Sequence, residues 1–124
     1  MRFAKIGAVS YVLWGLLHVV AALQEFSAGA SLEPGFIQGK IYQGSWDLLF
    51  FALAAMVIAI RLNWRNDTLG YWLNLLIVSI ADIGFLIFVL IPGYVELFPG
   101  ILGPVFWVLG AIFTTIGFRM KPTH

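Results

Sequence analysis

The chain has 124 residues, of which 61% are hydrophobic and only 10% are charged. A soluble domain carries about 25% charged residues, and a domain of this size buries only about two-thirds of its surface. This composition excludes a soluble fold and predicts a membrane protein that lipid solvates. The net charge of +1 gives no indication of nucleic-acid binding. The absence of cysteine excludes disulfides, thiolate metal sites and thiol nucleophiles.

Four apolar stretches are long enough to cross a bilayer, since a hydrocarbon core of about 30 Å needs about 20 residues of helix. They cover residues 6–23, 41–60, 69–91 and 101–118 approximately. None shows the alternation of barrel strands. We therefore expect an all-α integral membrane protein, in which residues 1–124 form one bundle of four transmembrane helices. A cleaved signal peptide is the alternative for the first stretch, although that stretch is rather long and contains His18.

The segments between these stretches are rich in turn residues. The longest, EFSAGASLEPGFIQGK at residues 25–40, contains glycines and Pro34 and predicts a loop that could act as a lid. The second, RLNWRNDTLG, is short and polar, and the third, PGYVELFPG, begins and ends with Pro-Gly pairs. The four helices should therefore run antiparallel to their neighbours in the chain.

Lysine and arginine are distributed unevenly between the two predicted sides. Lys40 alone lies on one side, and the other side carries Arg2, Lys5, Arg61, Arg65, Arg119 and Lys121. Positive loops stay in the cytoplasm. The sequence therefore predicts a multi-pass protein of the inner (plasma) membrane with both termini cytoplasmic. Small exporters that insert in both orientations need nearly balanced charge, which this chain lacks.

Three ionisable residues lie within the predicted spans, at similar depths. An aspartate inside a span costs about 2.5–3.5 kcal/mol, so each one needs a reason. Counted from the cytoplasmic end at 1.5 Å per residue, His18 and Asp82 lie at about 20 Å and Asp47 at about 21 Å. We expect these three residues, from three helices, to form one polar cluster in the outer half of the membrane.

Helical periodicity adds three further candidates for ligand binding. Tyr11 is seven residues from His18 on one face, and Gln43 is four residues from Asp47. Trp107, on the last span, could form a wall. Simpler interpretations remain open, because Tyr11 could be a packed aromatic residue and Gln43 and Asp47 could lie among lipid headgroups. Glycines at heptad spacing on the last span, Gly103, Gly110 and Gly117, indicate close helix packing.

The chemistry of the predicted cluster leaves several roles open. A histidine beside aspartates can exchange protons near neutral pH, so His18, Asp47 and Asp82 are also candidate catalytic residues. Imidazole with two carboxylates is a known metal-binding set. The short HxxxH and ExxH spacings are missing, however, and we predict neither a metal site nor a cofactor. The pair of His18 with an aspartate could also serve only to fix helix register.

The first span, IGAVSYVLWGLLHVVAAL, resembles the first helix of small four-helix bacterial inner-membrane proteins of the DoxX-like kind. The resemblance covers this span and the helix count. It implies an accessory inner-membrane subunit, of a kind sometimes associated with redox enzymes, although the chain has no haem or flavin motif.

Three functional interpretations follow. The first is binding or transport of a small ligand or proton at the cluster. The second is a membrane-embedded enzyme that acts on a lipophilic substrate with His18 and Asp82 or Asp47 as acid and base. The third is an accessory subunit in which the cluster is structural. Besides the lipid bilayer, we expect a small ligand or lipophilic substrate as partner. We also expect a homo-oligomer or a larger membrane complex, because four helices bury little surface alone.

Overall fold

A computed structural model describes residues 1–122, and all regular elements in this range are helical. They are α1 (Arg2–Ala30), α2 (Phe36–Arg61), the short η1 (Asn63–Arg65), α3 (Thr68–Phe85), its π-helical continuation η2 (Leu86–Leu90), α4 (Leu97–Gly100) and α5 (Leu102–Arg119). Four helices are long and apolar enough to cross a membrane: Arg2–Ala30, Phe36–Arg65, Thr68–Leu90 and Leu97–Arg119. The expected helical bundle is therefore present.

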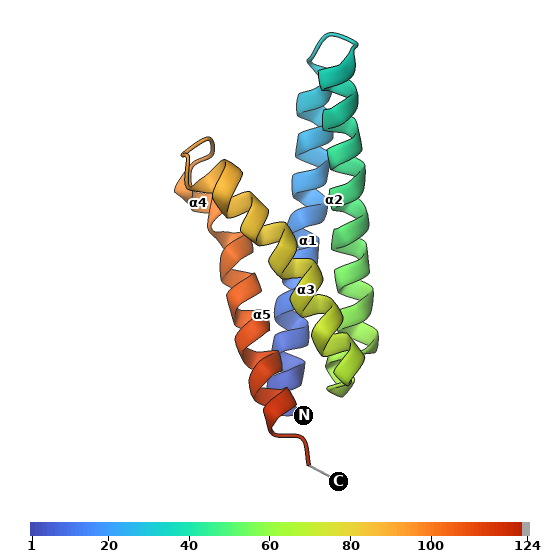
Figure 1. Cartoon of the computed structure of the whole chain (residues 1–124), viewed down its shortest axis with the longest axis vertical. Coiled ribbons are helices and arrows are strands. Elements are labelled where there is room, and N and C mark those ends of the chain that lie inside the picture. Colours follow the sequence, from blue (N-terminus) through green and yellow to red (C-terminus); the bar gives the residue numbers. More distant parts are fainter. Residues whose placement is uncertain (123–124) are drawn as a thin grey trace.

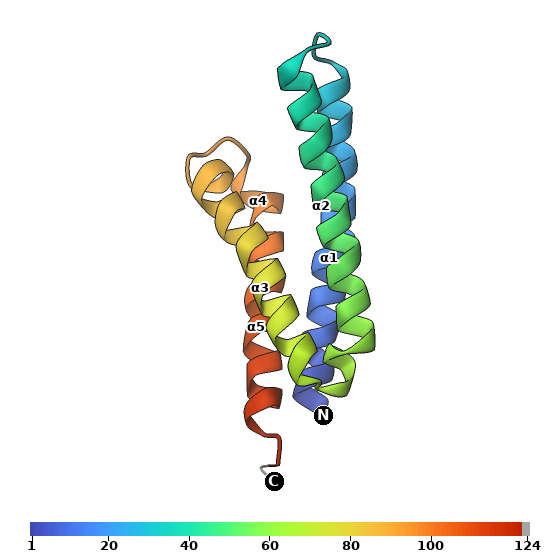
Figure 2. The same ribbon diagram turned by 45° about the vertical axis from the view of Figure 1, so that its right-hand side comes forward.

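The helices form two antiparallel pairs. Helices α1 and α2 make a long hairpin, and α3 and α5 make a shorter second pair (Figure 1). The beginning of α1, the end of α5 and η1 lie at one end, hereafter the termini end, where the two pairs lie close together. The pairs diverge toward the opposite end, hereafter the far end, and Figure 2 shows the same divergence after rotation. Helix α1 packs against both α2 and α5, while α3 contacts α2 and α5.

The buried interior consists mainly of small residues. Buried apolar residues are Ala4, Ala8, Ala22, Ala52, Ala55 and Ala59, with Tyr11, Trp14, Tyr71 and Val78. Large aliphatic side chains such as Leu76 and Ile80 are instead exposed. Helices in lipid pack in this way, because small residues let backbones approach and lipid solvates the large apolar side chains.

Glycines of α5 form the contact surface toward α1. A β-carbon on Gly110 would lie 2.6 Å from the Tyr11 ring, and one on Gly117 would lie 2.9 Å from the backbone nitrogen of Ala4. Only glycine allows this approach, which is the packing role expected from the heptad spacing. We call this row of contacts the α1–α5 seam.

The connection between α1 and α2 differs from the expected loop. Helix α1 continues to Ala30 and α2 begins at Phe36, so only residues 31–35 connect them. Gly29 does not end its helix, because it packs against Ile41. The Gln38 amide donates to the carbonyl oxygens of Gly29 (3.1 Å) and Leu32 (3.0 Å) and closes the turn. The expectation of a lid at residues 25–40 is therefore wrong, since helix occupies most of that segment.

A buried amide network joins the helices near the termini end. The fully buried Asn74 of α3 donates to Asn63 Oδ1 (2.7 Å) and to the Ala55 carbonyl oxygen (3.0 Å). Nearby, Asn66 donates to the Gly117 carbonyl oxygen at 2.8 Å. These bonds satisfy backbone carbonyls of α2 and α5 and so fix η1 and α3 against them.

Candidate functional site

His18 is held from three sides. Its Nδ1 lies 2.8 Å from the Trp14 carbonyl oxygen. Because a carbonyl can only accept, Nδ1 carries a hydrogen and donates it. Its Nε2 lies 3.6 Å from Oδ1 of Asp82. The ring also stacks on the Trp14 indole, with centroids 4.0 Å apart. The imidazole therefore has a defined orientation between α1 and α3.

Asp82 lies deep between the helices. It is fully buried on α3, and neither carboxylate oxygen has a hydrogen-bond partner among residues 1–122. A bare buried carboxylate is costly, so the imidazole of His18 is its natural counter-group. With one proton on the two side chains besides the hydrogen on Nδ1, the pair has no net charge.

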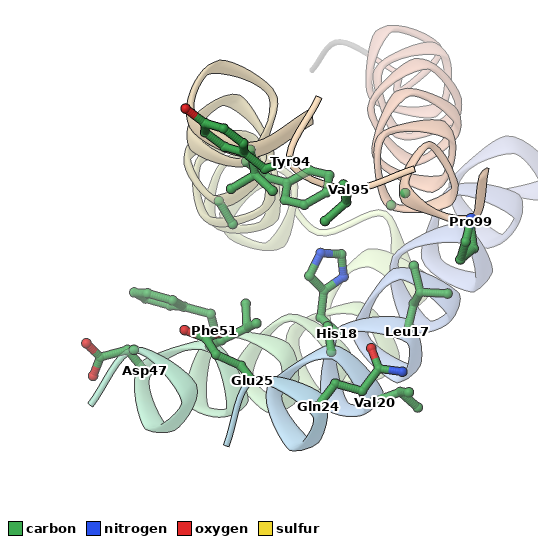
Figure 3. Close-up of a pocket in the computed structure, with 18 of the residues that line it drawn as sticks. Leu17, His18, Val20, Gln24, Glu25, Asp47, Phe51, Tyr94, Val95 and Pro99 are labelled. Carbon is green, nitrogen blue, oxygen red and sulfur yellow. The ribbon is translucent and has the colours of Figure 1, made fainter. Parts of the chain in front are cut away.

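A cavity of about 1060 Å³ opens between the α1–α2 hairpin and the second helix pair, toward the far end. Its walls are mostly apolar and include Leu17, Phe51, Phe85, Val89 and Val95. His18 projects into the space between the two pairs (Figure 3). The polar lining residues are His18, Gln24, Glu25, Asp47, Tyr94 and Glu96. The divergence of the helix pairs thus produces a large apolar site with a few polar groups.

The three residues of the predicted cluster have different positions. His18 and Asp82 make the ion pair described above. Asp47 lines the same cavity but is exposed. The one ion pair found within residues 1–122 joins His18 to Asp82, so Asp47 does not pair with His18. In the same range, no three histidine, aspartate or glutamate side chains lie close enough to hold a metal ion.

The other three candidates do not line this cavity. Gln43 is exposed and accepts a hydrogen bond from Lys40 Nζ at 2.7 Å. Tyr11 is fully buried against Gly110 in the α1–α5 seam. Trp107 donates its indole N–H to Ser79 Oγ at 2.8 Å. All three interact with other helical residues, so a role in this site would be indirect.

Several lining residues were not anticipated from the sequence. Glu25, the first residue of the predicted loop at residues 25–40, lies in α1 and lines the cavity one heptad beyond His18. Tyr94, Val95 and Glu96 come from the connection that precedes α4. The heptad spacing of Glu25 was a usable signal. The sequence did not indicate that this connection lines the cavity, because its position depends on how the chain turns back toward α5.

Comparisons of the chain with protein-family models, with curated proteins and with solved structures found no match. The resemblance of residues 6–23 to the DoxX-like kind therefore stays a prediction. The residues of the cavity are thus the basis for assigning a function.

Proposed function

We propose that the protein spans the inner (plasma) membrane four times, with both termini in the cytoplasm, and binds an amphipathic small molecule in the outer-half cavity beside His18. The apolar helices and their exposed large side chains support membrane insertion. The excess of lysine and arginine near the termini and in the 61–65 segment supports this orientation.

The cavity is the observation that carries this proposal. Ligand pockets have volumes of about 300–1,000 Å³, with apolar walls and a small number of polar groups. The cavity between the helix pairs matches this description in its walls, and its volume of about 1060 Å³ lies just above this range. An apolar body would lie against residues such as Leu17 and Phe51, and a polar group would lie near His18 or the carboxylates.

The orientation of His18 favours binding over acid–base catalysis. A catalytic histidine needs a ring nitrogen within about 2.6–3.2 Å of the substrate atom that carries or receives the proton. Here Nδ1 donates to the Trp14 carbonyl and Nε2 faces Asp82, so both nitrogens are directed at protein groups. Asp82 itself does not line the cavity. The pair therefore supports the wall of a binding site.

The proposal can be tested with the neutral lipophilic fluorophore N-phenyl-1-naphthylamine and the full chain in lipid nanodiscs. We expect saturable binding above that of empty nanodiscs. Ala21→Trp and Ala81→Trp introduce bulk into the cavity wall and should weaken binding about ten-fold, which corresponds to about 1.4 kcal/mol. Leu76→Trp, on an exposed face of α3, is the matched control and should bind as the wild type does. Equal binding by all four proteins would contradict the proposal.

A further inference from the structure

Carboxylates gather around the cavity, and cations do not. Glu25 of α1, Asp47 of α2 and Glu96 of the connection before α4 line it, which is three of the six acidic residues of the chain. None of the seven lysines and arginines is among the lining residues. A chain with a net charge of +1 therefore has a cavity of the opposite sign.

These carboxylates are not neutralised by neighbouring side chains. None of them has an ion pair within residues 1–122, where the one pair found is that of His18 with Asp82. Glu25 is half-buried, and its carboxylate lies across the hairpin, because a β-carbon on Gly44 of α2 would come within 2.9 Å of Glu25 Oε1. Figure 3 shows Glu25 and Asp47 on the hairpin side of the cavity.

A fourth carboxylate, that of Asp82, lies behind the wall of the cavity. It is fully buried, and neither of its oxygens accepts a hydrogen bond from residues 1–122. Gly103 lines the cavity, and a β-carbon there would lie 3.8 Å from Asp82 Oδ1. The same β-carbon would lie nearer to the His18 ring, 3.0 Å from Cε1 and 3.4 Å from Nε2, so the imidazole of His18 occupies the space beside Gly103 and Asp82. Asp82 is therefore the partner of His18, and the carboxylates available to a ligand are those of Glu25, Asp47 and Glu96.

The apolar part of the wall suits the same class of ligand. Phe51, Phe85 and Tyr94 line the cavity and offer aromatic faces. Such faces attract organic cations that are poorly hydrated. Low-dielectric walls also strengthen the field of the carboxylates inside a cleft.

We propose that the cavity selects lipophilic organic cations, which combine an apolar body with one ammonium or phosphonium centre, over neutral or anionic molecules of the same shape. This inference rests on the proposed binding function and adds the sign of the ligand charge.

Tetraphenylphosphonium and tetraphenylborate test this selectivity, because they share one shape and differ in the sign of charge. Binding of each to the full chain is measured in phosphatidylcholine nanodiscs, with empty nanodiscs subtracted. The phosphonium should bind saturably and at least about ten-fold more tightly than the borate, and added salt should weaken its binding.

Charge-neutral variants identify the residues responsible. Glu25→Gln, Asp47→Asn and Glu96→Gln should each weaken phosphonium binding by up to about five-fold, the range for partly exposed ion pairs. Glu33→Gln, in the turn between α1 and α2 and away from the cavity, is the matched control and should bind normally.

The outcomes separate this inference from the function on which it rests. A triple variant combines Glu25→Gln, Asp47→Asn and Glu96→Gln. Equal affinity of the wild type for both ions, or undiminished phosphonium binding by the triple variant, overturns the charge selectivity even if the neutral naphthylamine still binds saturably. Loss of saturable binding for every probe overturns both the selectivity and the binding function.

Discussion

Gly103 of α5 lies directly against the imidazole of His18. A β-carbon at this position would come within 3.0 Å of Cε1 and 3.4 Å of Nε2. Gly103 thus meets the Cε1–Nε2 edge of the imidazole, and the Trp14 ring stacks on one of its faces. The absence of a side chain at Gly103 therefore allows His18 to reach Asp82.

Gly103→Ala should disturb the ion pair. The added methyl group has to displace a ring that Trp14 already confines, and overpacking of this kind costs about 1–3 kcal/mol. We expect a lower midpoint of thermal unfolding in detergent. Gly84→Ala on α3 is the matched control, because a β-carbon there meets no atom within 4 Å. It should leave stability unchanged or raise it slightly. Equal behaviour of the two variants would show that His18 is not confined as described.

His18→Leu and Asp82→Leu should be coupled. Removal of His18 leaves a buried carboxylate without a counter-group, a loss of about 3–5 kcal/mol in the free energy of unfolding. The double variant should be more stable than the sum of the two single losses predicts, because it leaves no buried charge without a counter-group. A double-mutant cycle by chemical unfolding in detergent measures this coupling free energy between His18 and Asp82.

Asp47→Leu provides the comparison for that cycle. Asp47 has no ion pair with His18, so the losses from Asp47→Leu and His18→Leu should add. Strong coupling of His18 to Asp47 together with additivity for Asp82 would reverse the assignment of the pair.

Asn74→Leu should destabilise the junction near the termini. The substitution removes the donor to Asn63 Oδ1 and to the Ala55 carbonyl, and it leaves Asn63 Oδ1 buried without that donor. The expected loss is about 1–3 kcal/mol in the free energy of unfolding. Leu76→Ala, two residues along the same helix on the exposed face, should cost much less. Similar losses for the two variants would contradict a structural role for the amide network.

Single cysteines in this cysteine-free chain test the orientation. Glu33→Cys lies in the turn between α1 and α2, and Lys121→Cys lies after α5. With both termini in the cytoplasm, an impermeant maleimide added to intact cells should label position 33 and leave position 121 unlabelled until the membrane is permeabilised. The reverse pattern would invert the proposed topology.

Most of the fold could be predicted from the sequence, because long apolar runs with few charges have few alternatives in three dimensions. The α1–α2 turn could not be placed. Glycine, serine and proline in residues 25–40 indicate a loop by propensity. Packing of Gly29 on Ile41 and the hydrogen bonds of Gln38 instead extend both helices, and tertiary contacts of this kind are not visible in local sequence.

For the candidate site, the sequence predicted the level of each residue along its helix better than the direction in which its side chain points. Counting residues placed His18 and Asp82 at one level, and their side chains are 3.6 Å apart. The same count placed Asp47 at that level without showing whether its face of α2 turns toward His18. Tyr11 shares a helical face with His18, yet it meets α5 at Gly110 rather than the cavity. The rotation of each helix about its axis depends on packing partners that a single sequence does not reveal.

The α1–α5 seam makes the cavity sensitive to distant positions. Helices α1 and α5 are stiff and in contact, so the distance between them at the far end depends on the angle at which they cross. Gly117 lies fourteen residues from Gly103, about 21 Å along the helix axis. A larger side chain at Gly117 would push this end of α5 away from Ala4 and change the angle between α1 and α5. The other end of α5, where Gly103 lines the cavity, would then move as well. The width of the cavity is therefore set partly at the other end of the molecule, by residues that no ligand in the cavity would touch.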